Sequence, residues 1–125
     1  MQIEVSNGEL VDKVSILKIK LERISSAQKR VNIRKEFELL YGKLATIQIN
    51  EQSEFFQRLL EINTRLWEIE DQIRDKEARG EFDEDFIELA RQVYFQNDKR
   101  SQVKRAINIQ TESTIIEEKE YAQYS

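Results

Sequence analysis

The sequence contains no proline and only three glycines in 125 residues, so it lacks nearly all of the residues that interrupt helices. Proline removes a backbone donor and clashes with the preceding turn, and glycine loses more conformational entropy on folding than any other residue. Average usage would give about six prolines and about three times as many glycines as are present. The remaining sequence is rich in Glu, Lys, Arg, Leu and Ile. The chain is therefore expected to fold into long helices.

The sequence also contains no histidine and no cysteine, which excludes several classes of site. Without an imidazole there is no Ser-His-Asp triad and no histidine-bound metal, and without a thiol there is no nucleophilic cysteine, zinc finger or disulfide. We expect no cofactor. These absences do not decide whether the protein is an enzyme, although they favour a protein that is not one.

Length, charge and hydropathy narrow the class further. A chain of 125 residues forms one domain, here residues 1–125, and can bury about two-thirds of the surface that its unfolded form exposes. The net charge of −4 disfavours general binding to nucleic acids. The N-terminal segment has no basic and apolar signal sequence, and no apolar run approaches the ~20 residues of a membrane span. We expect a cytoplasmic protein without a membrane contact.

A first helix is predicted after Ser6, which forms a capping box with Glu9, while Val5 and Leu10 occupy the positions of a hydrophobic staple. The spacing of apolar residues predicts one packing seam as far as Ile24, with the end of the helix at Ser25 and Ser26. The charged residues between the seam positions are interpreted as ordinary charges that flank the seam: Asp12, Lys13, Lys18, Lys20, Glu22 and Arg23.

Three more helices are predicted by the same spacing, at residues 28–47, 54–79 and 83–109. Gly80 fits a left-handed C-cap of the third helix, and Asp83 fits the N-cap of the fourth. The third helix has a broad apolar face, so it is expected to contact two neighbours. With connections this short, the helices should form antiparallel hairpins in an all-α bundle spanning residues 6–109.

The two ends of the chain are expected to be non-helical. Residues 1–5 form an extended lead-in, and residues 110–125 form a tail that begins with strand-favouring residues at 113–116 and becomes acidic. Two alternatives remain open for this tail. It pairs with residues 3–5 as a small two-stranded patch, or it packs across the bundle.

A polar belt interrupts the apolar pattern of the fourth helix, because all seven residues at 96–102 are polar. Four cations lie between positions 99 and 105, and arginine and lysine are the side chains that hold phosphates and carboxylates. One interpretation is a site for an anionic ligand such as a nucleotide, a sugar phosphate or an RNA segment. The other is a solvated stretch of helix. The candidate ligand-binding residues are Asn97, Asp98, Lys99, Arg100, Lys104 and Arg105.

A weaker candidate is a magnesium site made of carboxylate pairs one helical turn apart, at Glu68 with Asp71 and at Asp85 with Glu88. All-helical nucleotide pyrophosphohydrolases bind Mg²⁺ through such pairs. Solvated acids in i,i+3 and i,i+4 ion pairs explain the same residues equally well. A Mg²⁺-dependent phosphohydrolase therefore ranks third among the functions considered.

Four stretches carry a resemblance to a known family: SNGELVDKVSILKIKLERI, LWEIEDQIRDKE, FIELARQVYFQNDKRSQVKRAIN and EEKEY. They resemble a family of small bacterial helical proteins classed only as a domain of unknown function. The resemblance covers about half of the chain and includes the polar belt. It implies a compact helical domain without an assigned activity, substrate or cofactor.

The leading hypothesis for the function is a non-enzymatic interaction module that works through its helix faces. Long helices in thin hairpins expose broad apolar faces, so self-association as a homo-oligomer is expected, and an unknown protein partner is expected as well. An anionic small molecule bound at residues 97–105 is the alternative.

Overall fold

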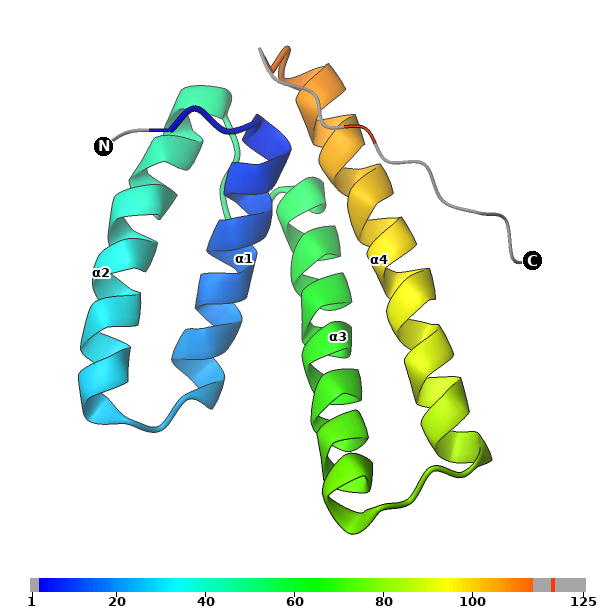
Figure 1. The fold of residues 1–125 in the computed structure, drawn as a ribbon. Coiled ribbons are helices and arrows are strands. Elements are labelled where there is room, and N and C mark those ends of the chain that lie inside the picture. The colour runs from blue at the N-terminus through cyan, green and yellow to red at the C-terminus, as the bar shows by residue number, and fades with distance from the viewer. Residues whose placement is uncertain (1–2, 114–117, 119–125) are drawn as a thin grey trace.

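The computed structural model describes residues 3–113 and residue 118. In this part of the chain the helices are α1 (Asn7–Arg23), α2 (Ala27–Leu44), α3 (Glu54–Arg79) and α4 (Glu84–Gln110), with a short 3₁₀ helix, η1 (Ala45–Ile47), after α2. They form two antiparallel hairpins, α1–α2 and α3–α4, that pack side by side (Figure 1). The prediction of an all-α bundle of long-helix hairpins is confirmed.

The helix ends follow the capping signals of the sequence. Ser6 is the N-cap of α1, and its hydroxyl accepts the backbone N–H of Glu9 at 3.1 Å. Asp83 caps α4 by accepting the N–H of Phe86 at 2.9 Å. Gly80 ends α3 in the left-handed conformation, with φ of 68°, which a glycine adopts without a steric penalty. These local signals predict α3 and α4 to within one residue.

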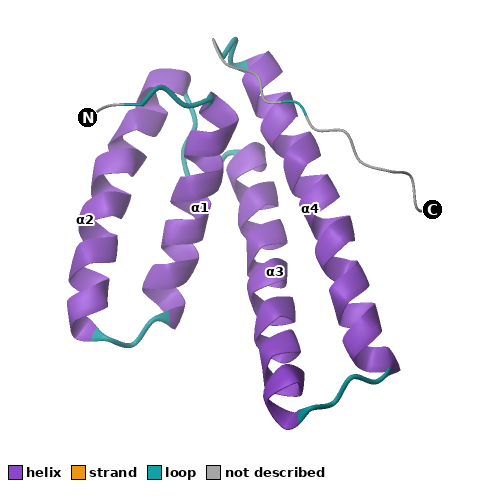
Figure 2. Ribbon diagram, in the orientation of Figure 1, coloured by secondary structure: helices purple, strands orange, loops and turns teal. Residues whose placement is uncertain are grey.

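Two predictions about helix and strand content need correction. The second helix does not run regularly to residue 47, because α2 ends at Leu44 and tightens into η1 before Gln48 adopts a left-handed conformation. Residues 3–5 are not in a strand (Figure 2). The predicted strand partner is residues 113–116, and all of it except Ser113 lies outside the described residues, as does the tail beyond it apart from residue 118.

Helix α1 lies at the centre of the fold, because it packs against α2, α3 and α4, while α3 also packs against α4. This position explains why α1 is buried on more than one face. Its fully buried residues include small and polar side chains that a single packing seam would leave outside. The main apolar cluster joins all four helices through Val11, Val14, Leu44, Ile49, Phe56, Leu59, Val103 and Ile107.

The α3–α4 hairpin is longer than the α1–α2 hairpin, with helices of 26 and 27 residues against 17 and 18. At about 1.5 Å per residue, α3 is roughly 13 Å longer than α1. The far end of the α3–α4 hairpin therefore projects beyond the α1–α2 hairpin (Figure 1). None of the helices in the described ranges combines the length and the apolar character that crossing a membrane requires.

Candidate functional site

The predicted ligand-binding belt lies in the middle of α4, which is continuous from Glu84 to Gln110. Arg100, Lys104 and Asn108 follow each other at intervals of four residues, so their side chains lie on one face of the helix. That face packs on α1, where each of the three meets a polar group. We call this set of contacts the α1–α4 ladder: Arg100 with Asp12, Lys104 with Glu9, and Asn108 with Gly8.

The contact between Arg100 and Asp12 is a bidentate ion pair. The guanidinium Nε donates to Asp12 Oδ1 at 2.9 Å, and Nη2 donates to Oδ2. The Asp12 side chain is 0% exposed and that of Arg100 is 28% exposed. The pairing raises the pKa of Arg100 above its ordinary value, with the hydrogen bonds to Asp12 as the main cause. The sequence pattern predicts Asp12 as an ordinary charge that flanks the seam of the first helix, and that prediction is wrong because the side chain is buried and paired.

Two further side chains complete the surroundings of Asp12. Asn63, which is buried on α3, donates through Nδ2 to Asp12 Oδ1 at 2.8 Å and to Ser15 Oγ at 2.9 Å. The Ser15 hydroxyl donates in turn to the backbone carbonyl of Asp12 at 2.6 Å. A charge buried in this way is tolerated only when it is paired and hydrogen-bonded. This polar cluster therefore ties α1, α3 and α4 together.

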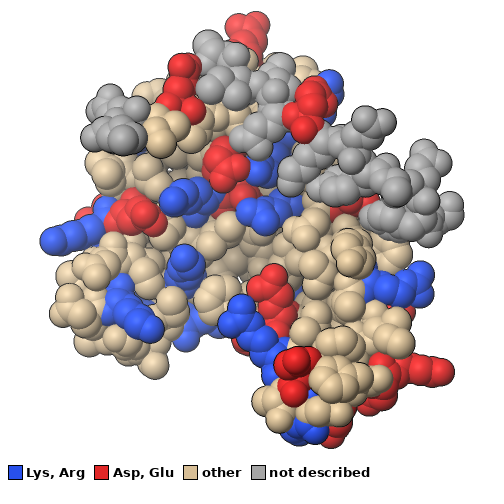
Figure 3. Space-filling model, in the orientation of Figure 1, with Lys and Arg blue, Asp and Glu red and all other residues tan. Residues whose placement is uncertain are grey.

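The next contact of the ladder joins Lys104 to Glu9, with 2.6 Å between Nζ and Oε2. The Lys104 side chain is only 12% exposed. Figure 3 shows acidic and basic side chains side by side over the region where α1 and α4 meet. The two strongest anion-binding candidates of the belt, Arg100 and Lys104, thus both contact carboxylates of the same chain.

The last contact of the ladder is a close approach of two backbones. The N–H of Gly8 donates to Asn108 Oδ1 at 2.6 Å, and a Cβ on Gly8 would collide with the carbonyl oxygen of Lys104. Asn7 extends the contact, because its Nδ2 donates to Thr111 Oγ1 at 2.8 Å. The Nδ2 of Asn108 is buried without a hydrogen-bond partner among the described residues. No local sequence pattern marks Gly8, Asn63 or Asn108 as site residues.

The other belt candidates are placed differently. Arg105 pairs with Glu118 at 3.0 Å on the surface, which raises the pKa of Arg105. Asn97 and Asp98 are half-buried, whereas Lys99 is exposed. The structure therefore does not bring the six predicted residues into one site: Arg100 and Lys104 face α1, while Lys99 lines a groove between α3 and α4.

This groove between α3 and α4, the α3–α4 groove, encloses about 910 Å³. Arg58 and Arg65 line it from α3, and Lys99 lines it from α4. No ion pair joins these three cations to an acidic group in the described ranges. The remaining lining residues are mostly amides, acids and aliphatic side chains: Gln57, Leu60, Glu61, Ile62, Thr64, Glu68, Gln96, Gln102 and Val103.

The candidate magnesium ligands lie on the surface of the α3–α4 hairpin and make other contacts. Glu68 pairs with Arg23 at 3.2 Å, and Glu88 pairs with Arg91 at 3.5 Å. Asp71 and Asp85 are exposed. Within residues 3–113 and at residue 118, no group of three or more histidine, cysteine, aspartate or glutamate side chains is arranged to hold a metal ion.

Fold and site together define a bundle of two helical hairpins that is fastened by an internal polar ladder and carries an open groove. The model of the Family of unknown function (DUF6165) matches residues 1–124. The chain belongs to this family. No curated protein and no solved structure matches it.

Proposed function

We propose that this protein is a non-enzymatic interaction module that binds an acidic peptide segment of a partner protein in the α3–α4 groove. The observation that carries the proposal is the set of three cations in the groove, Arg58, Arg65 and Lys99. They come from both helices and have no ion-pair partner within the described residues, so their charge is available to a ligand.

The arrangement of the charges favours an extended ligand. Arg58 and Arg65 are seven residues apart, which places them on one side of α3 at a separation of about 10 Å. Of the two acids in the lining, Glu68 is already paired with Arg23. Glu61 is the remaining acid, so the groove as a whole presents a positive surface to a bound chain.

The lining residues match a peptide better than a nucleotide. Single-stranded nucleic acids and their bases are commonly bound by stacking on aromatic side chains, and no aromatic side chain among the described residues lines the groove. Three glutamine side chains do line it, at positions 57, 96 and 102, and amides can both donate to and accept from a peptide backbone. The volume of about 910 Å³ is also within the range of ligand-binding clefts.

The interior of the protein supports a binding role over a catalytic one. The sequence offers no histidine or cysteine as base or nucleophile, and Asp12 and Arg100, the most deeply placed charged pair, satisfy each other. A Mg²⁺-dependent phosphohydrolase stays a prediction. So does an anionic small molecule at residues 97–105, which would require Arg100 and Lys104 to leave Asp12 and Glu9.

The proposal includes a cytoplasmic location, where a partner with an acidic segment would be met. The absence of cysteine supports it, because many secreted domains depend on disulfides that this sequence does not offer. Fractionation of cells that express the protein tests this part separately, since recovery with the membranes or outside the cell would contradict it.

The binding proposal is tested by fluorescence anisotropy with a labelled peptide of about eight glutamates, in low salt. Arg58→Gln/Arg65→Gln should weaken binding at least about tenfold, since each charge-assisted hydrogen bond contributes roughly 1.5–3 kcal/mol. The matched control is Lys13→Gln/Lys43→Gln, which removes two exposed cations outside the groove. The control should bind within about twofold of wild type, because neither lysine lines the groove.

Three other results would contradict the proposal. The first is an equal loss in both variants, which would indicate general charge attraction. The second is no binding of the peptide at millimolar protein. The third is preferential binding of ADP or of an oligothymidylate over the glutamate peptide, which would replace the acidic peptide with an anionic ligand of another class.

A further inference from the structure

The two hairpins carry opposite charge at their free ends. We define the basic tip as residues 16–35, the half of the α1–α2 hairpin nearest its turn, and the acidic tip as residues 67–96, the corresponding half of the α3–α4 hairpin. The basic tip contains seven cations and one acid, and the acidic tip contains ten acids and four cations. Their net charges, +6 and −6, are equal and opposite, whereas the whole chain has a charge of only −4.

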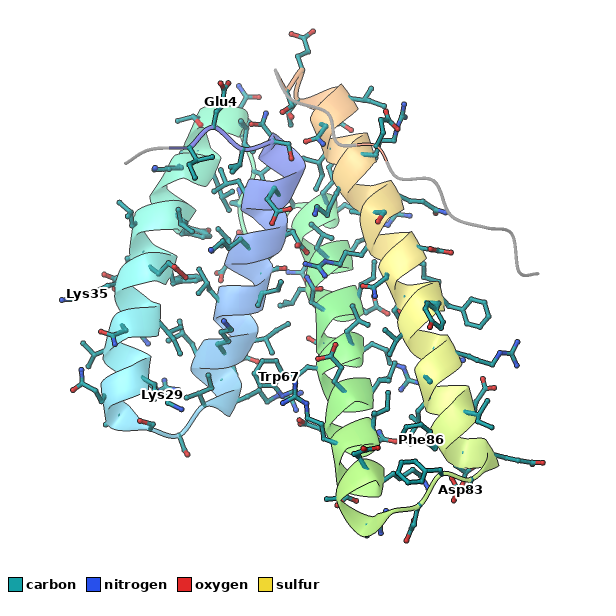
Figure 4. The ribbon with its side chains drawn as sticks, in the orientation of Figure 1. Glu4, Lys29, Lys35, Trp67, Asp83 and Phe86 are labelled. Carbon is teal, nitrogen blue, oxygen red and sulfur yellow. The ribbon has the colours of Figure 1, made fainter. Side chains whose placement is uncertain are left out.

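Both tips lie at the same end of the molecule, and the acidic tip projects further (Figure 1). In Figure 3 the charged side chains at the basic tip are blue, and red side chains are prominent at the acidic tip. Within one chain the tips are linked through Arg23 and Glu68. Trp67 lies on the side of α3 that faces α1, where the hairpins diverge (Figure 4). This end of the molecule therefore has a stepped outline, in which the acidic tip projects beyond the basic tip.

We propose that the partner for this end is a second copy of the chain, related by a two-fold axis that places each basic tip against the other copy's acidic tip. A rotation of 180° places the short basic tip of one copy opposite the long acidic tip of the other. The same operation therefore makes both the shapes and the charges of the two copies complementary. A two-fold contact of this kind is self-complementary and closes as a dimer.

The side chains at the tips are suited to such a contact. Lys29 and Lys35 at the basic tip, and Glu77 and Glu84 at the acidic tip, are exposed and make no ion pair with the described residues. Exposed apolar side chains accompany them: Val31 at the basic tip, and Phe82 and Ile87 at the acidic tip. An apolar centre with complementary charges around it is the usual composition of a specific interface.

The test is sedimentation equilibrium of the full chain in low salt, with three double variants that reverse exposed charges. The basic-tip variant is Lys29→Glu/Lys35→Glu, and the acidic-tip variant is Glu77→Lys/Glu84→Lys. The control, Lys13→Glu/Lys43→Glu, makes the same change in net charge as the basic-tip variant at positions outside both tips. None of the six residues lines the α3–α4 groove, so the outcome is independent of peptide binding there.

The wild type should reach a limiting mass of two chains of 14.9 kDa, and its dimer should weaken at least about tenfold when salt is raised from ~50 to ~500 mM. Each tip variant alone should dimerise at least about tenfold more weakly than wild type, because it opposes like charges twice. The control should match wild type. An equal mixture of the two tip variants should form a mixed dimer nearly as strong as that of wild type.

Recovery in the mixture separates the proposal from damage to the fold, because two misfolded variants would not restore each other. A monomeric wild type at millimolar concentration in low salt would overturn the proposal. So would a dimer that neither tip variant weakens, or tip variants that fail to combine. Growth of the wild type beyond two chains would overturn the closed two-fold arrangement.

Discussion

Arg100 on α4 holds the buried carboxylate of Asp12 on α1 through two parallel hydrogen bonds, across 88 positions of sequence. The guanidinium is planar and presents a pair of donors to both carboxylate oxygens, a geometry that lysine cannot reproduce. Since Asp12 is fully buried, its charge depends on this partner and on Asn63. The pair fixes how the α1–α2 hairpin sits on the α3–α4 hairpin.

The amide of Asn63 should contribute strongly to the stability of the fold, because it donates a hydrogen bond to the buried carboxylate of Asp12 at 2.8 Å. Asn63→Asp replaces that donor with a second carboxylate of the same shape. At pH 7 we expect a loss of about 3 kcal/mol in the free energy of unfolding, the cost of an unpaired buried charge. Urea titrations followed by circular dichroism measure it.

The pH dependence of the Asn63→Asp variant gives a further check. Repulsion raises the folded-state pKa of the introduced carboxyl above its unfolded value, so the folded state binds the extra proton more tightly. The deficit relative to wild type should therefore shrink as the pH falls from 7 to 5. A deficit that is small at pH 7, or that does not change with pH, would contradict the placement of Asn63 beside Asp12.

Gly8 and Gly42 should respond in opposite directions to the same substitution. A methyl group on Gly8 would collide with the Lys104 carbonyl, whereas the space around Gly42 is open. Gly8→Ala should therefore destabilise the fold by at least about 2 kcal/mol. Gly42→Ala, in the last turn of α2, should stabilise it by up to about 0.5–1 kcal/mol. Similar behaviour of the two variants in thermal unfolding would refute the close approach of α1 and α4.

Asp83 links stability to acid pH at the start of α4. The N–H of Phe86 and the ammonium of Lys76 lower the pKa of this carboxyl below its ordinary value. A lowered folded-state pKa contributes stability that is present above the unfolded pKa and is lost as the pH falls through the folded one. Asp83→Asn keeps a capping side chain but removes the charge. It should melt below wild type at pH 6, and the difference should shrink as the pH falls from 6 toward 2.5; a difference independent of pH would contradict this role.

Much of the fold was predictable because its signals are local. Ser6, Gly80 and Asp83 determine helix ends through contacts with residues three or four positions away. The burial of Asp12 has no such local signal. An acid on an amphipathic helix usually faces water, and Asp12 is buried because its partners lie on α3 and α4, far along the chain.

The candidate site was predictable only in part for the same reason. Sequence reasoning identified the polar belt and placed Arg100 and Lys104 on one helix face. It could not determine whether that face meets solvent or another helix. The stripe at residues 100, 104 and 108 matches two acids of α1, Glu9 and Asp12, and the backbone N–H of residue 8. Comparing the two sets of residues would have indicated the ladder.

The most direct test of the ladder is a double-mutant cycle with Asp12→Asn and Arg100→Met, measured by urea unfolding at pH 7. Arg100→Met alone should cost about 3 kcal/mol, because it leaves a buried carboxylate with one partner fewer. The double variant should be more stable than the sum of the two losses predicts, with a coupling energy of at least about 2 kcal/mol. A coupling energy below about 0.5 kcal/mol would mean that Arg100 and Asp12 do not form this ion pair. Arg100 would then be available to bind an anionic ligand at the polar belt.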